Sequence, residues 1–222
     1  MNMATSNTTM VKICGLSDPE SLRVAIDNGA RYLGFVFYPK SPRAITIDTA
    51  SMLCRQVPAG VKTVGLFVNP TEEELDHIMG RVSLDMIQLH GTETPEQLIA
   101  IKTKYACPVI KAFPISTTAD LDAIPAYNES ADWFLFDTKS TQTDGTFGGS
   151  GHVFDWAILK DKVFAKPWML AGGLTIENVA EAITLLHPNA VDISSGVERE
   201  RGIKDPNKIK DFLKTVTQKH SN

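Results

Sequence analysis

The chain has 222 residues, of which 43% are hydrophobic and 22% charged, and this composition suits one large domain with a sizeable buried core. Its net charge is −4 and no basic stripe is present, which argues against a nucleic acid partner. No apolar run approaches the roughly 20 residues that a membrane span needs, so we expect no membrane partner.

Residues 1–9 are polar and uncharged, without the basic patch and apolar core of a signal peptide. We therefore expect residues 1–10 to be a flexible tail and residues 11–222 to form the folded domain. The three cysteines are an odd number and lack the spacing of metal ligands. This favours a reducing cytoplasm, and it argues against a disulfide framework or a metal site.

Eight short runs rich in apolar and β-branched residues recur along the chain, and we predict a strand in each. They are residues 11–14, 32–37, 63–68, 86–90, 109–113, 133–137, 168–171 and 191–194. Most end at a glycine, a proline or a polar turn that leads into a helical pattern.

Five segments between or after these runs carry signals for the start of a helix. They are Ser17-Asp18-Pro19-Glu20, Asn69-Pro70-Thr71-Glu72, Thr94-Pro95-Glu96, Thr175-Ile176-Glu177 and Asp205-Pro206. A proline early in a helix wastes no hydrogen bond, and acidic residues there suit the helix dipole.

The alternation of eight strands with helices predicts the α/β class with a parallel sheet. Eight units in a chain of this length fit a single (β/α)8 TIM barrel with a closed sheet. A doubly wound open sheet is the alternative. It would normally carry a glycine-rich dinucleotide fingerprint after the first strand, and Cys14-Gly15-Leu16-Ser17 is not one. We therefore predict the barrel.

Two of the predicted strands end in a reactive side chain, Cys14 before Gly15 and Asp137 after a Trp-Phe-Leu-Phe run. In such a barrel the active site lies at the carboxyl ends of the strands. A lone cysteine is often only a small buried hydrophobe, and a functional role is the equal alternative here. The evidence for Asp137 is stronger, because an acid closing an apolar run is costly unless it is paired or used.

Glycine-rich turns follow the last two predicted strands. Gly172 and Gly173 come after the seventh strand, and Ser195 and Gly196 come after the eighth. Barrels of this kind frequently bind phosphate with these two loops through backbone N–H groups. Two ordinary turns are the alternative, but both at the expected places favour a phosphate site.

Three further residues are candidates for supporting roles. Arg43 is either a solvated loop cation or a fork for a substrate carboxylate, and His90 is either structural or part of the site. If Cys14 faces the barrel mouth, strand alternation points Lys12 inward one layer below it. Because the first and eighth strands are neighbours, we predict an ion pair between Lys12 and Asp192. The alternative is a Lys12 that points outward between helices.

Several segments together resemble the phosphoribosylanthranilate isomerase family of tryptophan biosynthesis. They are Val11-Lys12-Ile13-Cys14-Gly15, Gly34-Phe35-Val36-Phe37, Ser41-Pro42-Arg43, Val64-Gly65-Leu66-Phe67-Val68-Asn69, Ile87-Gln88-Leu89-His90-Gly91, Asp137-Thr138, Gly148-Gly149-Ser150-Gly151, Phe154-Asp155-Trp156, Ala171-Gly172-Gly173-Leu174 and Val191-Asp192-Ile193-Ser194-Ser195-Gly196-Val197-Glu198. The resemblance covers nearly the whole chain from Val11 onward. Ser150 stands where the family often has threonine, and the loop at 140–146 is slightly long.

The resemblance implies a cofactor-free Amadori rearrangement of N-(5-phosphoribosyl)anthranilate to 1-(2-carboxyphenylamino)-1-deoxyribulose 5-phosphate. It makes Cys14 the general base, Asp137 the general acid and Arg43 the residue that binds the carboxylate. Asp137 would have to hold its proton near neutral pH. Cys14 would act as a thiolate, so we expect its pKa to be lowered.

Rival hypotheses differ in the residues they require. A ribulose-phosphate epimerase would need a metal site of histidines and aspartates, and only His90 is available at a strand end. An indole-glycerol-phosphate synthase would need an acid or a lysine in place of Cys14. A silent barrel that only binds phosphosugars would need no thiolate. The sequence leaves monomer and homodimer open, and Gly148-Gly149-Ser150-Gly151 is the candidate for a mobile lid.

Overall fold

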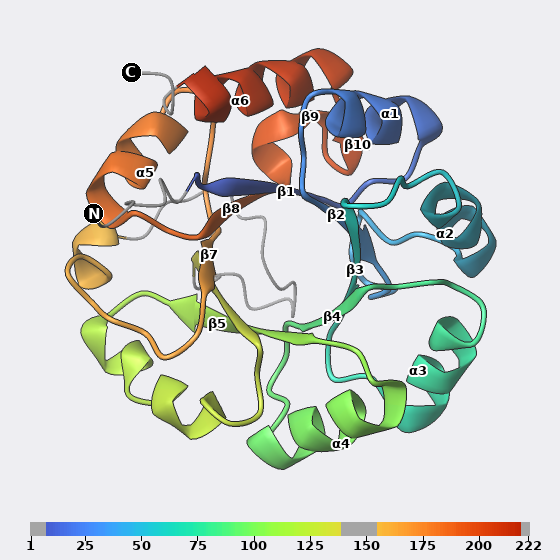
Figure 1. Cartoon of the computed structure of the whole chain (residues 1–222), viewed down its shortest axis with the longest axis horizontal. Coiled ribbons are helices and arrows are strands. Elements are labelled where there is room, and N and C mark those ends of the chain that lie inside the picture. The colour runs from blue at the N-terminus through green and yellow to red at the C-terminus, as the bar shows by residue number, and fades with distance from the viewer. Residues whose placement is uncertain (1–7, 139–154, 219–222) are drawn as a thin grey trace, which may run out of the picture.

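Eight strands pair in sequence order, and the first also pairs with the last, which closes a parallel barrel (Figure 1). The structure is a computed structural model that describes residues 8–138 and 155–218. The strands are β1 (Met10–Cys14), β2 (Tyr32–Val36), β3 (Lys62–Phe67), β4 (Met86–Leu89), β5 (Val109–Ile115), β6 (Trp133–Thr138), β7 (Trp168–Leu170) and β8 (Ala190–Ile193). Each overlaps a predicted run and differs from it only at the ends, so the predicted (β/α)8 barrel is confirmed.

Helices surround the barrel on its outer face (Figure 1). They are α1 (Pro19–Asp27), α2 (Ile47–Cys54), α3 (Glu72–Met79), α4 (Pro95–Tyr105), α5 (Val179–Leu186) and α6 (Pro206–Gln218). Three of the predicted start signals work as caps at the places expected. Asp18 accepts a hydrogen bond from the Ser21 amide, and Thr71 and Thr94 each close a capping box.

One predicted helix begins later than its start signal. Thr175 and Asn178 bond each other's backbone amides through their side chains, at 2.8 and 3.3 Å. This closes a turn, and α5 begins only at Val179. The turn takes up the residues that we predicted for the start of the helix.

Short 3-10 helices stand beside several of the strands. They are η1 (Thr118–Leu121), η2 (Ile124–Tyr127), η3 (Trp156–Ile158) and η4 (Ser195–Val197). A small antiparallel hairpin of β9 (Glu198–Glu200) and β10 (Ile203–Lys204) follows η4. The sequence did not predict this hairpin, because its charged residues lack the apolar alternation of a strand.

The apolar core has two parts. A large cluster lies between the barrel and the helices, and a smaller one, which includes Val64, Ile110, Leu135 and Met169, fills the barrel interior. This packing fixes the strand ends from which the site is built.

The first strand begins inside the predicted tail. The Met10 amide donates to the Asn189 carbonyl at 2.9 Å, and the Thr9 hydroxyl donates to the Pro188 carbonyl at 3.1 Å. Residues 9 and 10 therefore belong to the barrel, whereas residues 1–7 and the lid candidate at 148–151 lie outside the described residues. Within the described residues, no helix is long and apolar enough to cross a membrane.

Candidate active site

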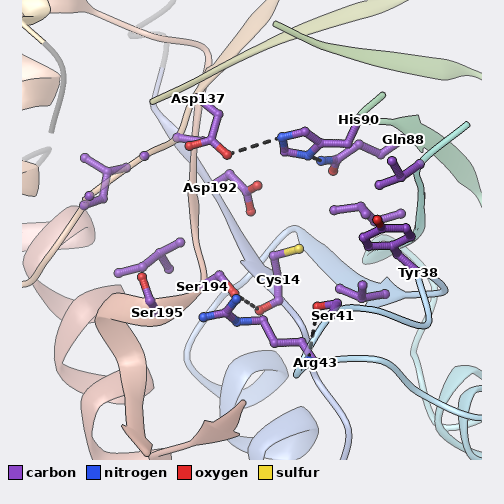
Figure 2. Close-up of a pocket in the computed structure, with 18 residues that line it drawn as sticks. Cys14, Tyr38, Ser41, Arg43, Gln88, His90, Asp137, Asp192, Ser194 and Ser195 are labelled. Atoms are coloured by element: carbon purple, nitrogen blue, oxygen red, sulfur yellow. Dashed lines mark hydrogen bonds and ion pairs between the residues drawn. The ribbon is translucent and has the colours of Figure 1, made fainter. Parts of the chain in front are cut away.

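A pocket opens at the carboxyl ends of the strands, where loops lead out to the helices. It encloses about 670 Å³, counting the space open to solvent at its mouth. Side chains from several strand ends and loops face it (Figure 2). Most of the predicted site residues line it: Cys14, Arg43, His90, Asp137, Gly172, Gly173, Asp192 and Ser195.

The predicted ion pair beneath the site is confirmed. Lys12 and Asp192 are register partners on β1 and β8, and Lys12 Nζ lies 3.0 and 3.1 Å from the two carboxylate oxygens. The Lys12 side chain is 0% exposed, so the outward-pointing alternative is wrong. Burial on its own would lower the pKa of Lys12, but Asp192 and Cys14 raise it above its ordinary value. Lys12 is therefore a buried cation.

The thiol of Cys14 shares a small space with this ammonium group. A Cβ added at Gly34 on β2 would lie 2.9 Å from Cys14 Sγ and 3.2 Å from Lys12 Nζ. Burial raises the pKa of Cys14 and Lys12 works in the opposite direction, with burial the stronger influence. The expected lowering of this pKa is therefore wrong for the protein without substrate.

The two oxygens of Asp137 have different partners. Oδ1 accepts a hydrogen bond from the Thr138 amide at 2.7 Å, and Oδ2 lies 3.3 Å from His90 Nε2. Figure 2 shows this contact at the far side of the pocket from Arg43. Oδ2 is thus the oxygen that faces His90, and His90 lies in the site rather than serving the barrel alone.

Arg43 bonds to Glu198, a residue to which the sequence analysis assigned no role. Its Nε and Nη2 donate to the two carboxylate oxygens of Glu198 at 2.6 and 3.0 Å. Burial works to raise the pKa of Glu198, yet Arg43 and Lys204 together hold it below its ordinary range. The predicted fork therefore faces Glu198, and Nη1 makes no hydrogen bond to the described residues.

A second buried pair holds the loops after β3 and β4. Lys111 Nζ donates to Glu93 at 2.9 Å and to the Gly91 carbonyl at 2.7 Å, and Glu93 also accepts from the Asn69 amide at 2.8 Å. The pair lies beside His90, the residue before Gly91. Sequence reasoning missed it, although a lysine within the apolar run of β5 was a signal that it needed a partner.

The two loops predicted to bind phosphate meet at one edge of the pocket. Gly172 and Gly173 have φ of 83° and 64°, the left-handed region that favours glycine. A Cβ at Gly172 would lie 2.8 Å from Asp137 Oδ1, and one at Gly196 would strike the Leu174 carbonyl. Glycine therefore allows these loops to pack against Asp137 and against each other. No cluster of metal-binding side chains is present in the parts of the chain described above.

Comparison with known proteins identifies the family. Residues 11–215 match the sequence profile of N-(5'phosphoribosyl)anthranilate (PRA) isomerase. The chain belongs to the PRA isomerase family. It is therefore an isomerase of tryptophan biosynthesis, which confirms the function that the resemblance implied.

Individual PRA isomerases match over nearly their full length. The N-(5'-phosphoribosyl)anthranilate isomerase of Paracoccus denitrificans is 50% identical over 207 residues, which are 93% of this chain and 96% of that one. The crystal structure of the enzyme from Thermotoga maritima has a TM-score of 0.85 and 38% identity, covering 95% of this chain and 99% of that one. A solved PRA isomerase in complex with reduced 1-(o-carboxyphenylamino)-1-deoxyribulose 5-phosphate has a TM-score of 0.80, with 36% identity and coverage of 95% and 99%.

Proposed function

We propose that this PRA isomerase acts by general acid–base catalysis, with Asp137 as the acid and Cys14 as the base. The reaction converts N-(5-phosphoribosyl)anthranilate to 1-(2-carboxyphenylamino)-1-deoxyribulose 5-phosphate. The observation that carries the assignment is the convergence of a carboxyl, a thiol and a guanidinium group on one pocket.

The first step opens the ribose ring. Asp137 gives its Oδ2 proton to the furanose ring oxygen, the C1–O bond breaks, and the lone pair of the anthranilate nitrogen forms an iminium ion at C1. The contact with His90 at 3.3 Å supports this role, because it gives the proton of Oδ2 a defined position.

The second step moves a proton from C2. The Cys14 thiolate takes the C2 proton, and the C–H electrons form the C1–C2 double bond while the iminium becomes an amine. The resulting enolamine tautomerises to the C2 ketone. The Lys12 ammonium next to Sγ supports the thiolate, because it offsets part of the cost of a buried negative charge.

The remaining groups would hold the two anionic ends of the substrate. Arg43 would donate from Nη1 to the anthranilate carboxylate while Glu198 keeps the guanidinium in place. The backbone N–H groups around Gly172, Gly173, Ser195 and Gly196 would hold the phosphate. The solved relative with bound reduced 1-(o-carboxyphenylamino)-1-deoxyribulose 5-phosphate supports a ligand with both anionic groups.

The test follows the loss of anthranilate-type fluorescence when enzyme is added to N-(5-phosphoribosyl)anthranilate made in situ. We expect Cys14→Ala and Asp137→Asn each to lower kcat by about 10²–10⁴-fold, the usual range for one acid–base step. Cys54→Ala, which removes a buried thiol from α2, is the matched control and should keep full activity. Turnover that survives the Cys14 or Asp137 change would keep the isomerase and overturn that residue's role.

We also propose that the enzyme works in the cytoplasm without a nucleic acid partner, as a monomer or homodimer. Three free, buried cysteines suit a reducing compartment, and a net charge of −4 disfavours binding to phosphate backbones. One solved relative, from Thermotoga maritima, is described as dimeric. Sedimentation of the purified chain would distinguish the two assembly states.

A further inference from the structure

Gln88 carries a buried polar atom without a partner. It lies on β4, its exposed fraction is 0%, and it lines the pocket. Its Nε2 lies 3.1 Å from His90 Nδ1, whereas its Oε1 makes no hydrogen bond within the described residues. An unpaired buried acceptor carries the full cost of losing its water, so an apolar residue would serve the fold better here. The amide therefore calls for a functional explanation.

Gln88, His90 and Asp137 form a chain of two contacts. Gln88 meets His90 at Nδ1, and Asp137 meets His90 at Nε2. A neutral imidazole carries one N–H and one bare nitrogen, so its two partners must play opposite roles. An amide offers a donor and an acceptor of nearly the same shape, so Gln88 satisfies either tautomer by turning its side-chain amide.

The two orientations of the amide correspond to two protonation states of Asp137. When Gln88 Nε2 donates to Nδ1, His90 holds its proton on Nε2 and donates it to an Asp137 carboxylate. When Gln88 Oε1 accepts from Nδ1–H, His90 Nε2 is bare and accepts a proton from the Asp137 carboxylic acid. Only the second state has the acid form that ring opening needs.

We propose that Gln88 is a positioning residue that permits the Nδ1–H tautomer of His90 and thereby lets Asp137 keep its proton. The Oε1 atom left unpaired in one orientation is the acceptor used in the other. The inference rests on Asp137 as the general acid, as proposed above. To that assignment it adds Gln88 as the residue that can bond to His90 with the proton on either Nδ1 or Nε2.

The charged groups around this chain come from several strands. Asp192 on β8 faces both Asp137 and His90, and it is held by Lys12 on β1, next to Cys14. Arg43 lines the pocket on the loop after β2. Replacing Gln88 by methionine changes none of these charges, so its effect would act through the hydrogen bond to His90.

The test compares Gln88→Met with the wild-type enzyme. Methionine has nearly the same length and removes the unpaired oxygen, so we expect the melting temperature to stay the same or rise. We expect kcat to fall about tenfold or more with little change in KM, because His90 without its acceptor keeps the proton on Nε2 and Asp137 stays ionised. Met86→Leu, on the same strand and also inside the barrel, is the control and should keep kcat.

The tautomer of His90 is read directly by NMR of protein labelled with 15N-histidine, with His90 assigned by its loss in His90→Asn. We expect the wild type to populate the Nδ1–H form beside the Nε2–H form, and Gln88→Met to show only the Nε2–H form. The same tautomer in both proteins, or full kcat in Gln88→Met, would overturn the proposal. Full activity of Asp137→Asn would instead refute the acid, which keeps the two failures distinguishable.

Discussion

At the scale of single residues, the proposed base lies in surroundings that oppose its own ionisation. Cys14 is 4% exposed, and burial raises the pKa of its thiol. Lys12 is the nearest compensating charge, and its ammonium is itself held by Asp192. Removing the charge of Lys12 would therefore act on the reaction through Cys14.

The raised pKa of Cys14 predicts how activity depends on pH. In the proposed mechanism the thiolate is the reactive form, so kcat/KM should rise as pH approaches this pKa from below and fall about tenfold for each pH unit below it. Lys12→Met removes the opposing cation, so the pKa of Cys14 should rise further and activity near pH 7 should drop. Measuring kcat/KM from about pH 6 to pH 10 checks both statements. Lys210→Met, at an exposed position on α6, should leave the profile unchanged, and an unchanged profile in Lys12→Met would contradict the role of that ammonium.

If Arg43 binds the substrate carboxylate as proposed, Glu198 acts on the substrate through it. Glu198→Gln removes the charge that receives Nε and Nη2, so the guanidinium should no longer be fixed toward the pocket. We expect KM to rise about tenfold, as for a lost charge-assisted hydrogen bond, with a smaller change in kcat. Steady-state kinetics give the two constants separately. Glu200→Gln, an exposed position on the same hairpin, is the matched control, and an equal rise in KM there would show that the hairpin as a whole is responsible.

At the scale of elements, β2 contributes to the site by the absence of a side chain. Gly34 is the register partner of Cys14, and a methyl group there would stand 2.9 Å from Sγ and 3.2 Å from Lys12 Nζ. The strand thus leaves room in which thiol and ammonium meet.

Gly34→Ala should separate these two groups. We expect a loss of about 10²-fold or more in kcat, as for removal of a base, while the circular dichroism spectrum stays that of the folded barrel. Gly29→Ala is the contrasting variant, because nothing lies within 4 Å of its Cβ but its φ is 94°. That change should lower the melting temperature and leave kcat intact. Full activity in Gly34→Ala would refute the account.

The elements of the barrel could be predicted from the sequence because each depends on neighbouring residues. Apolar runs marked the strands, and Thr71 and Thr94 marked helix starts. Asp137 could be predicted as a site residue because a carboxylate at the end of an apolar strand is costly to bury without a partner. The charged hairpin at 198–204 has no such local pattern, and it forms beside η4 where Asp205 N bonds the Val197 carbonyl.

Contacts between distant elements set the limit for predicting the site. Lys12–Asp192 was accessible because parity and barrel closure are general rules. Arg43–Glu198 joins a loop to a hairpin that was itself not predicted. The pKa of Cys14 depends on how deeply the folded barrel buries it. Gln88 was overlooked because its proposed role rests on an atom that has no partner among the described residues.

At the scale of the whole molecule, closure between β1 and β8 holds the site together. The seam includes four register pairs, from Met10↔Ala190 to Ile13↔Ile193. Hydrogen bonds from Thr9 and Met10 to the segment before β8 extend it toward the bottom of the barrel. The two sides of the site, with Cys14 on one and Asp192 on the other, meet across this seam.

Shortening the chain at its start tests the contribution of the seam. A variant that begins at Val11 loses the bonds of Thr9 and Met10, whereas one that begins at Thr8 keeps them. We expect the shorter chain to lose about 1–3 kcal/mol of unfolding free energy relative to the longer one, from the missing hydrogen bonds of Thr9 and Met10. Urea unfolding of both proteins measures this difference. Equal urea midpoints would show that residues 9 and 10 contribute nothing to the stability of the barrel.

The ion pairs of the site also join residues that a ribosome makes far apart in time. Lys12 and Asp192 are separated by 180 positions and Arg43 and Glu198 by 155. At the usual pace of bacterial and eukaryotic translation, Lys12 waits roughly 10–40 s for its counter-charge. Throughout that interval its ammonium remains hydrated, and the nascent barrel stays open along its last seam. In the proposed mechanism the site is complete only after Asp192 and Glu198 have been made, so we expect a product terminated before them to be inactive.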